Sequence, residues 1–318
     1  RILTAAAIRQ VGRQRQQVEL AAERGTDRHD GPGASTIQAA GTDVRVRVSG
    51  PDRAEGGTAL LLHGIGRSLQ DWDEQHARLS ARHKVISLDL PGFGFSPRSP
   101  AGMGLNSLAD AAVATLDALG ESAPVHLVGN SLGGAVAMTV LARHPERVRT
   151  LTLASSAGFG AKASLDLRML AVPGLGPWLL RRPTRTVTAR VERTLYADPR
   201  LATPERIDHA LALALVPGRA EAFREALLSV GSIRRVRPGW RRVLLKRLRA
   251  HRVPALVVWG EQDTVLPSEQ LSSAADALPH ARTILLADTG HLPQVERPDR
   301  FAAEVLRLWT EADGQASP

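Results

Sequence analysis

The chain has 318 residues, of which 43% are hydrophobic and 3% aromatic, with no cysteine and a formal net charge of +9 at pH 7. This length suits one large domain or a domain with an insertion, and the absence of cysteine excludes disulfides and thiolate metal sites. The low aromatic content argues against nucleic acid as a partner, and the lack of an 18-residue apolar run argues against an integral membrane span.

The first 35 residues differ in composition from the rest. Residues 10–35 are rich in Gln, Arg, Glu and Asp, and the sequence Asp-Gly-Pro-Gly at 30–33 interrupts any helix there. They predict a helical or disordered arm over residues 1–35, followed by a strand at Val44–Val48. The apolar run within residues 1–9 is too short for a secretory signal, which favours a cytoplasmic location. The chain opens on Arg, which leaves open whether residues are missing upstream.

An apolar strand is predicted at Thr58–Leu62, and the loop His-Gly-Ile-Gly follows it at 63–66. A loop in this position can direct a backbone N–H at a developing oxyanion. The N–H of Ile65 is the expected donor. His63 is a candidate base, but a structural role for His63 and Gly64 in bracing this loop is the favoured interpretation.

The segment 125–134 indicates a short apolar strand, a serine flanked by glycines, and an apolar helix from Leu132 to about Arg143. A serine on a sharp strand-to-helix turn has its hydroxyl held out above the sheet edge, and this marks Ser131 as the candidate nucleophile. Gly129 and Gly133 stand where strand and helix come too close for a Cβ. The N–H of Leu132 is the second expected oxyanion donor.

About a hundred residues without strand character lie between the predicted strands Val148–Leu153 and Ala255–Trp259. Helical patterns there, separated by prolines such as Pro177 and Pro238, predict a helical cap over residues 158–250. The helical patterns are at about Leu165–Val172, Thr186–Leu195, Pro204–Leu215 and Glu221–Val230.

The cap interval is strongly basic. Residues 159–250 hold 19 Lys/Arg and 7 Asp/Glu, a balance of +12, so the rest of the chain sums to −3. An arginine-rich composition with a solvated cap surface explains this excess. The alternatives are an anionic substrate or peripheral contact with an anionic membrane. If the positive charge steers a substrate, some of seven cap arginines should border the pocket entrance. The set is Arg181, Arg182, Arg234, Arg235, Arg237, Arg241 and Arg242.

A serine nucleophile needs a base, and the base needs an orienting acid. The turn at 260–263 leaves the strand Ala255–Trp259, and His291 follows the predicted strand Thr283–Leu286. Asp263 and His291 are therefore both expected at the carboxyl ends of strands, where open α/β sheets build their sites. Glu261, two residues before Asp263, is the alternative acid.

With these residues in place, the chain resembles the α/β-hydrolase superfamily over roughly residues 40–312. Further matching segments are 89–96, 259–263, and 290–291 with 296–298. The resemblance implies a mostly parallel, doubly wound sheet with a helical cap insertion, a core of residues 36–157 and 251–312, and catalysis by Ser131, Asp263 and His291. We expect neither a cofactor nor a metal ion.

Within the superfamily, the Gly-Asn-Ser-Leu-Gly-Gly sequence around Ser131 looks like the carboxylesterases and the meta-cleavage-product hydrolases, which break C–C bonds. A serine at this position argues against epoxide hydrolases and haloalkane dehalogenases. The C–C hydrolases commonly carry tryptophan after the histidine, whereas Leu292 stands here.

The first functional hypothesis is hydrolysis of a carboxylic ester of a small or medium apolar substrate through an acyl-enzyme. C–C bond hydrolysis and non-catalytic binding of a small ligand on the same scaffold are the alternatives. The oligomeric state stays open.

Overall fold

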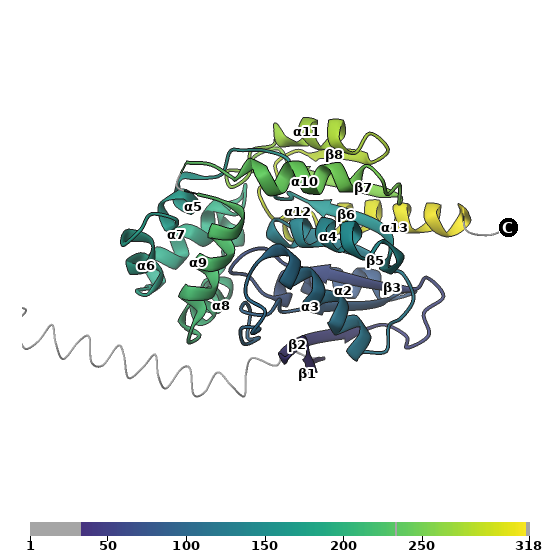
Figure 1. Cartoon of the computed structure of the whole chain (residues 1–318), viewed down its shortest axis with the longest axis horizontal. Coiled ribbons are helices and arrows are strands. Elements are labelled where there is room, and N and C mark those ends of the chain that lie inside the picture. Colours follow the sequence, from purple (N-terminus) through teal and green to yellow (C-terminus); the bar gives the residue numbers. More distant parts are fainter. Residues whose placement is uncertain (1–32, 233, 316–318) are drawn as a thin grey trace, which may run out of the picture. The chain divides into compact units, whose positions relative to one another are not determined.

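The computed structural model describes residues 33–232 and 234–315, and its central feature is an eight-stranded sheet (Figure 1). The arm predicted over residues 1–35 lies almost wholly outside the described residues. The strand order is β1-β2-β4-β3-β5-β6-β7-β8. The strands are β1 (Ala34–Ala39), β2 (Thr42–Ser49), β3 (Thr58–Leu62), β4 (Lys84–Leu88), β5 (Val125–Asn130), β6 (Val148–Ala154), β7 (Ala255–Gly260) and β8 (Arg282–Leu286).

The six strands from β3 to β8 run parallel to one another, and β2 pairs with β4 in the antiparallel sense, with Val46 opposite Leu88. The predicted mostly parallel sheet is confirmed. Strand β1 was not predicted, because most of its side chains are exposed or half-buried and give little hydrophobic periodicity. It joins β2 through Ala40 and Gly41, both at positive φ (53° and 72°).

Helices cover both faces of this sheet, as a doubly wound fold requires. Neighbouring residues of β3 alternate between two apolar clusters: Leu60 and Leu62 pack on one face, and Ala59 and Leu61 on the other. The first face is covered by α3 (Leu105–Ala118), α4 (Leu132–Arg143), α10 (Pro238–Leu248) and α11 (Gln270–Ala277). The second is covered by α2 (Asp73–Leu79) and α13 (Pro298–Gln315), with α12 (Pro293–Glu296) beside them.

The region between β6 and β7 is helical. The first five of its α-helices are α5 (Leu165–Leu170), α6 (Leu175–Leu180), α7 (Arg185–Thr194), α8 (Pro204–Leu215) and α9 (Arg219–Val230). Pro177 and Pro238 were expected to break helices but lie in the first turns of α6 and α10. Proline fits there because the first N–H groups of a helix have no intrahelical partner.

Helix α10 falls inside the interval predicted as the cap, yet it packs against α4. Its Leu244 and Leu248 belong to the same buried cluster as the core of the sheet. We therefore propose that the cap ends before Pro238. Among the residues described here, no helix has the length and apolar character needed to cross a membrane.

Candidate active site

Ser131 occupies the turn between β5 and α4, at the carboxyl edge of the sheet. Its φ of 54° and ψ of −118° lie in a strained region for a residue with a side chain. The turn is tight because Gly129 and Gly133 lack side chains: a Cβ on Gly129 would lie 2.6 Å from the amide nitrogen of Gly134. A Cβ on Gly133 would lie 2.5 Å from the carbonyl oxygen of His63. Strand and helix therefore approach each other closely at both glycines.

Replacing Gly133 is expected to destabilise the fold. In a helix, alanine is favoured over glycine by ~1 kcal/mol, but the new methyl group would collide with the carbonyl oxygens of His63 and Leu62. We expect Gly133→Ala to lower the free energy of unfolding by at least ~2 kcal/mol, measured by urea denaturation. Gly239 in α10 is the control, because a Cβ added there would meet nothing within 4 Å. Gly239→Ala should leave stability unchanged or raise it, and equal losses in both variants would contradict this account.

Asp263 and His291 form a buried, hydrogen-bonded pair. His291 Nδ1 lies 2.8 Å from Asp263 Oδ2, while Asp263 Oδ1 accepts from the amides of Val265 and Leu266 at 2.8 and 2.9 Å. Both carboxylate oxygens are therefore occupied, and the aspartate is held in one orientation. Glu261, the alternative acid, is exposed to solvent. The pairing thus favours Asp263 over Glu261 as the partner of the imidazole.

The His291 main chain is anchored on both sides. Its carbonyl oxygen accepts from Asn130 Nδ2 at 3.1 Å, and its N–H donates to the carbonyl of Leu195 at 2.8 Å. The first bond ties His291 to the residue before Ser131, and the second ties it to the cap. No hydrogen bond joins Ser131 Oγ to His291 within the described residues, and such bonds often tighten only when substrate is bound.

The loop at 63–66 lies against Ser131. A Cβ on Gly64 would be 3.2 Å from Ser131 Cβ, so a side chain there would crowd the serine. His63 is fully buried; Nδ1 lies 2.7 Å from the Gly64 carbonyl oxygen and Nε2 accepts from the Leu90 amide at 3.0 Å. Burial lowers the pKa of His63 below its ordinary value. Both ring nitrogens therefore have partners, one in the 63–66 loop and one in the segment after β4, which argues for the bracing role rather than for a base.

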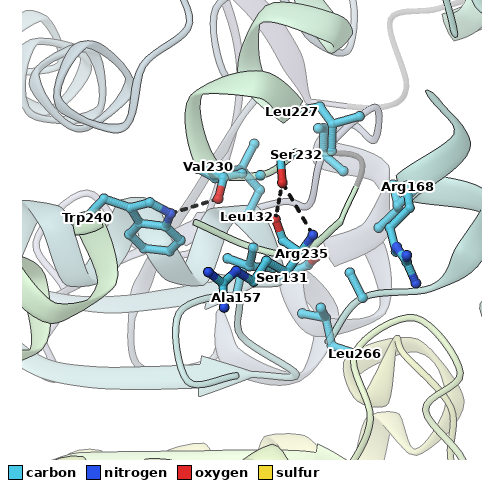
Figure 2. Close-up of a pocket in the computed structure, with 15 residues that line it drawn as sticks. Ser131, Leu132, Ala157, Arg168, Leu227, Val230, Ser232, Arg235, Trp240 and Leu266 are labelled. Atoms are coloured by element: carbon cyan, nitrogen blue, oxygen red, sulfur yellow. Dashed lines mark hydrogen bonds between the residues drawn. The ribbon is translucent and has the colours of Figure 1, made fainter. Parts of the chain in front are cut away.

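Ser131, Leu132 and Ile65 all line one pocket, with a cavity volume of ≈ 60 Å³ (Figure 2). Most of its other walls are apolar, with Leu227 and Trp240 among them, and most come from the cap and from α10. Its further lining residues are Ala157, Ala163, Leu167, Arg168, Val230, Gly231, Ser232, Arg235, Val236 and Leu266.

Steering of a substrate predicts that some of the seven arginines named above border the pocket. One of them, Arg235, lines it, and Arg168, outside that set, lines it too. Arg241 instead donates to the carbonyl oxygens of Gly158 and Phe159 at 3.0 and 2.9 Å, so it supports the chain that leaves β6. The cap arginines therefore divide between pocket, backbone and surface positions.

Glu296 is a site residue whose role the sequence did not reveal. Its Oε1 accepts from the amide of Gly290 at 2.6 Å, and its Oε2 accepts from the amide of Ala197 at 2.8 Å. One carboxylate thus joins the loop before His291 to the cap. Burial raises the pKa of Glu296, while these backbone donors act in the opposite direction. The segment 296–298 resembles a family motif, but no sequence pattern identifies a partner for the carboxylate.

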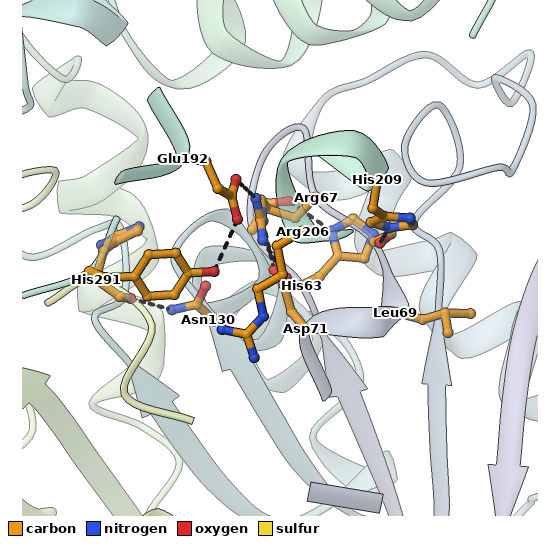
Figure 3. A network of polar contacts seen from close by, with 12 residues as sticks. His63, Arg67, Leu69, Asp71, Asn130, Glu192, Arg206, His209 and His291 are labelled. Carbon is orange, nitrogen blue, oxygen red and sulfur yellow. Dashed lines mark hydrogen bonds and ion pairs between the residues drawn. The ribbon is translucent and has the colours of Figure 1, made fainter. Parts of the chain in front are cut away.

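A second polar network also joins cap and core, and Figure 3 shows it beside Asn130 and His291. Arg67, just past the loop at 63–66, makes two hydrogen bonds to Asp71, at 2.9 and 2.7 Å. Its Nη1 lies 2.6 Å from Glu192 Oε2 on α7, and Tyr196 donates to the other oxygen of Glu192 at 3.0 Å. The Arg67–Glu192 pair therefore connects the cap to the segment that follows Ile65.

One group in the described part of the chain has the residue types of a metal site: His83, His126 and Asp313. Both ring nitrogens of His126 already have partners, the hydroxyl of Thr150 at 2.9 Å and the carbonyl of Gly56 at 3.1 Å. Asp313 is paired with an arginine at 2.6 Å. His126 lies near the start of β5, at the opposite end of the strand from Ser131. These contacts do not favour a metal ion there.

Comparison with known proteins gives consistent matches. The family model described as alpha/beta hydrolase fold matches residues 59–298. The dihydrolipoyllysine-residue acetyltransferase component of the acetoin cleaving system of Pseudomonas putida is 34% identical over 92% of this chain and 74% of its own length. The 2-hydroxymuconate semialdehyde hydrolase of Pseudomonas sp. (strain CF600) is 31% identical over 85% of this chain and 93% of its own length.

Among solved structures, a mutant of the meta-cleavage product hydrolase CumD superposes with a TM-score of 0.73 at 24% identity, covering 87% of this chain and 98% of its own. This likeness concerns the fold. The family model covers well over half of the chain, and the predicted fold class is confirmed. The chain therefore belongs to the alpha/beta hydrolase fold family.

Proposed function

We propose that this hydrolase cleaves a carboxylic ester through an acyl-enzyme, with Ser131 as nucleophile. The observation that carries the proposal is the Asp263–His291 hydrogen bond of 2.8 Å, held beside the strained turn of Ser131 by Asn130. A serine hydroxyl is a weak nucleophile at neutral pH, and an oriented imidazole is the usual means of activating it.

In the proposed reaction, His291 Nε2 takes the proton of Ser131 as Oγ attacks the ester carbonyl carbon. Asp263 keeps the proton of His291 on Nδ1 and stabilises the imidazolium that forms. The N–H groups of Ile65 and Leu132 bind the oxyanion. The imidazolium then protonates the departing alcohol, and a water molecule activated by His291 hydrolyses the acyl-enzyme. No cofactor takes part in these steps.

The pocket supports a short acyl group. The pocket is small, with a cavity volume of ≈ 60 Å³, and apolar residues such as Leu132 and Leu227 form much of its wall. We therefore expect kcat/KM to fall as the acyl chain of the ester lengthens beyond a few carbons.

Hydrolysis of a C–C bond is the second candidate. Two relatives named as 2-hydroxymuconate semialdehyde hydrolases are 31% and 30% identical to the chain. Arg168 and Arg235 line the same pocket as Ser131, and their charge suits an anionic dienoate. The small cavity and Leu292, which is buried in an apolar cluster with cap residues such as Tyr196, favour the ester instead.

Purified protein should be assayed on p-nitrophenyl esters of increasing acyl length and on a dienoate ring-fission product. We expect the short esters to have the highest kcat/KM. A strong preference for the dienoate would indicate that the protein cleaves a C–C bond and not an ester. A fluorophosphonate probe should label Ser131, and a folded protein that remains unlabelled and inactive on every substrate would indicate a non-catalytic ligand-binding protein.

A further inference from the structure

Exposed apolar side chains are concentrated on the first three cap helices. We call the exposed side chains of residues 162–193 the α5–α7 surface. Nine large hydrophobic side chains are exposed among the residues that the structure describes, and six of them belong to this surface, with exposed fractions from 38% to 66%. They are Leu165, Met169, Leu175, Trp178, Val187 and Val191. Single exposed apolar residues are ordinary, but such a concentration makes these helices a candidate interaction surface.

The charge of the same segment is positive. Residues 162–193 contain seven Lys/Arg and two acidic residues, and one of the two, Glu192, is buried against Arg67. Arg181 and Arg185 pair with acidic residues of later cap helices. The basic residues that have no acidic partner within the described chain include Lys162, Arg182, Arg190 and Arg193.

Exposed apolar and cationic side chains are interspersed along this surface. The guanidinium of Arg182 lies over the ring of Trp178, 5.3 Å from its centroid. Helix α7 turns Ala189 and Glu192 inward, whereas Val187, Arg190 and Val191 are exposed. Helices α5 and α6 contact each other and carry the other exposed apolar side chains of this surface. Figure 1 shows α6 at the end of the cap farthest from the sheet.

We propose that the α5–α7 surface binds the surface of an anionic lipid bilayer. Leucine, valine and tryptophan side chains enter the boundary between headgroups and acyl chains, while the arginines contact lipid phosphates. A basic patch complements an anionic bilayer, whereas docking against a second copy of itself would bring like charges together. The inference is independent of the proposed reaction, because vesicle binding can be measured without turnover.

The test is cosedimentation of the full chain with vesicles of phosphatidylcholine mixed with phosphatidylglycerol, and with pure phosphatidylcholine vesicles. We expect at least roughly tenfold stronger binding to the anionic vesicles, weakening as salt is raised. The double variants Leu165→Ala/Trp178→Ala and Arg190→Gln/Arg193→Gln should each lower the affinity by about tenfold or more. All four side chains are exposed, so the fold should be retained.

Matched controls lie elsewhere on the chain: Leu285 on β8 is 49% exposed, and Arg53 is exposed. Leu285→Ala and Arg53→Gln should bind as the parent does. The proposal is overturned by equal binding to neutral and anionic vesicles, by no binding, or by controls that lose as much as the cap variants. Binding that survives both double variants would come from another part of the chain and would also overturn it. Two further results would overturn the proposal. Self-association that Leu165→Ala/Trp178→Ala abolishes would indicate a second copy of the chain as the partner, and stronger retention on polyglutamate than on anionic vesicles would indicate an acidic polypeptide.

Discussion

Ser131→Ala is expected to lower ester turnover by about four to six orders of magnitude, because it removes the atom that would form the proposed acyl-enzyme. The fold should survive the change. Ser131 Oγ makes no hydrogen bond within the described residues, and alanine has the same backbone restriction as serine at a φ of 54°. The measurements are kcat and KM on a short p-nitrophenyl ester, with the melting temperature as a check on folding.

Ser155 offers a matched control for this experiment. It also follows a parallel strand at the carboxyl edge of the sheet, has a positive φ of 42°, and is fully buried without a hydrogen-bond partner for its hydroxyl. Its amide pairs with Val258, and the amide of Ser131 pairs with neighbouring Ala154. Ser155→Ala should retain kcat within about threefold. Near-parental turnover in Ser131→Ala would refute the proposed nucleophile.

The sequence predicted the sheet well because its central strands are short, almost continuously apolar and bounded by turns. Strands β3, β5 and β7 fall within about a residue or two of their expected bounds. Edge strand β1 has mostly exposed or half-buried side chains and carried no such signal. Helix α10 was missed for a different reason: its proline lies at the first helical position, where it starts a helix instead of breaking one.

The sequence also identified those residues of the candidate site that come just after a strand. Ser131, Asp263 and His291 each come just after a strand, and parallel strands bring such positions to one edge. Contacts between core and cap could not be predicted, because Arg67 and Glu192 are 125 positions apart and no local pattern pairs them. For the same reason Glu296 was recognised only as part of a motif, and its two backbone partners required the structure.

Asp263→Asn is expected to lower kcat by about four orders of magnitude with little change in the fold. The carbonyl oxygen of the asparagine would keep the position of Oδ1, because the amides of Val265 and Leu266 can only donate to it. The new amide group would then face His291 Nδ1, where Asp263 Oδ2 now lies at 2.8 Å. An amide donor there favours the tautomer with the proton on Nε2, the nitrogen that must accept the proton of Ser131.

Glu261→Gln is the matched control for Asp263→Asn, since it makes the same chemical change on the exposed acid two residues away. It should leave kcat within about threefold, whereas Asp263→Asn should slow both ester turnover and labelling of Ser131 by a fluorophosphonate. Labelling reports the nucleophile directly, so a fall in both rates with an unchanged melting temperature separates a tautomer defect from unfolding. If Glu261→Gln caused the larger loss, Glu261 would be the orienting acid and the buried Asp263–His291 pair would have only a structural role.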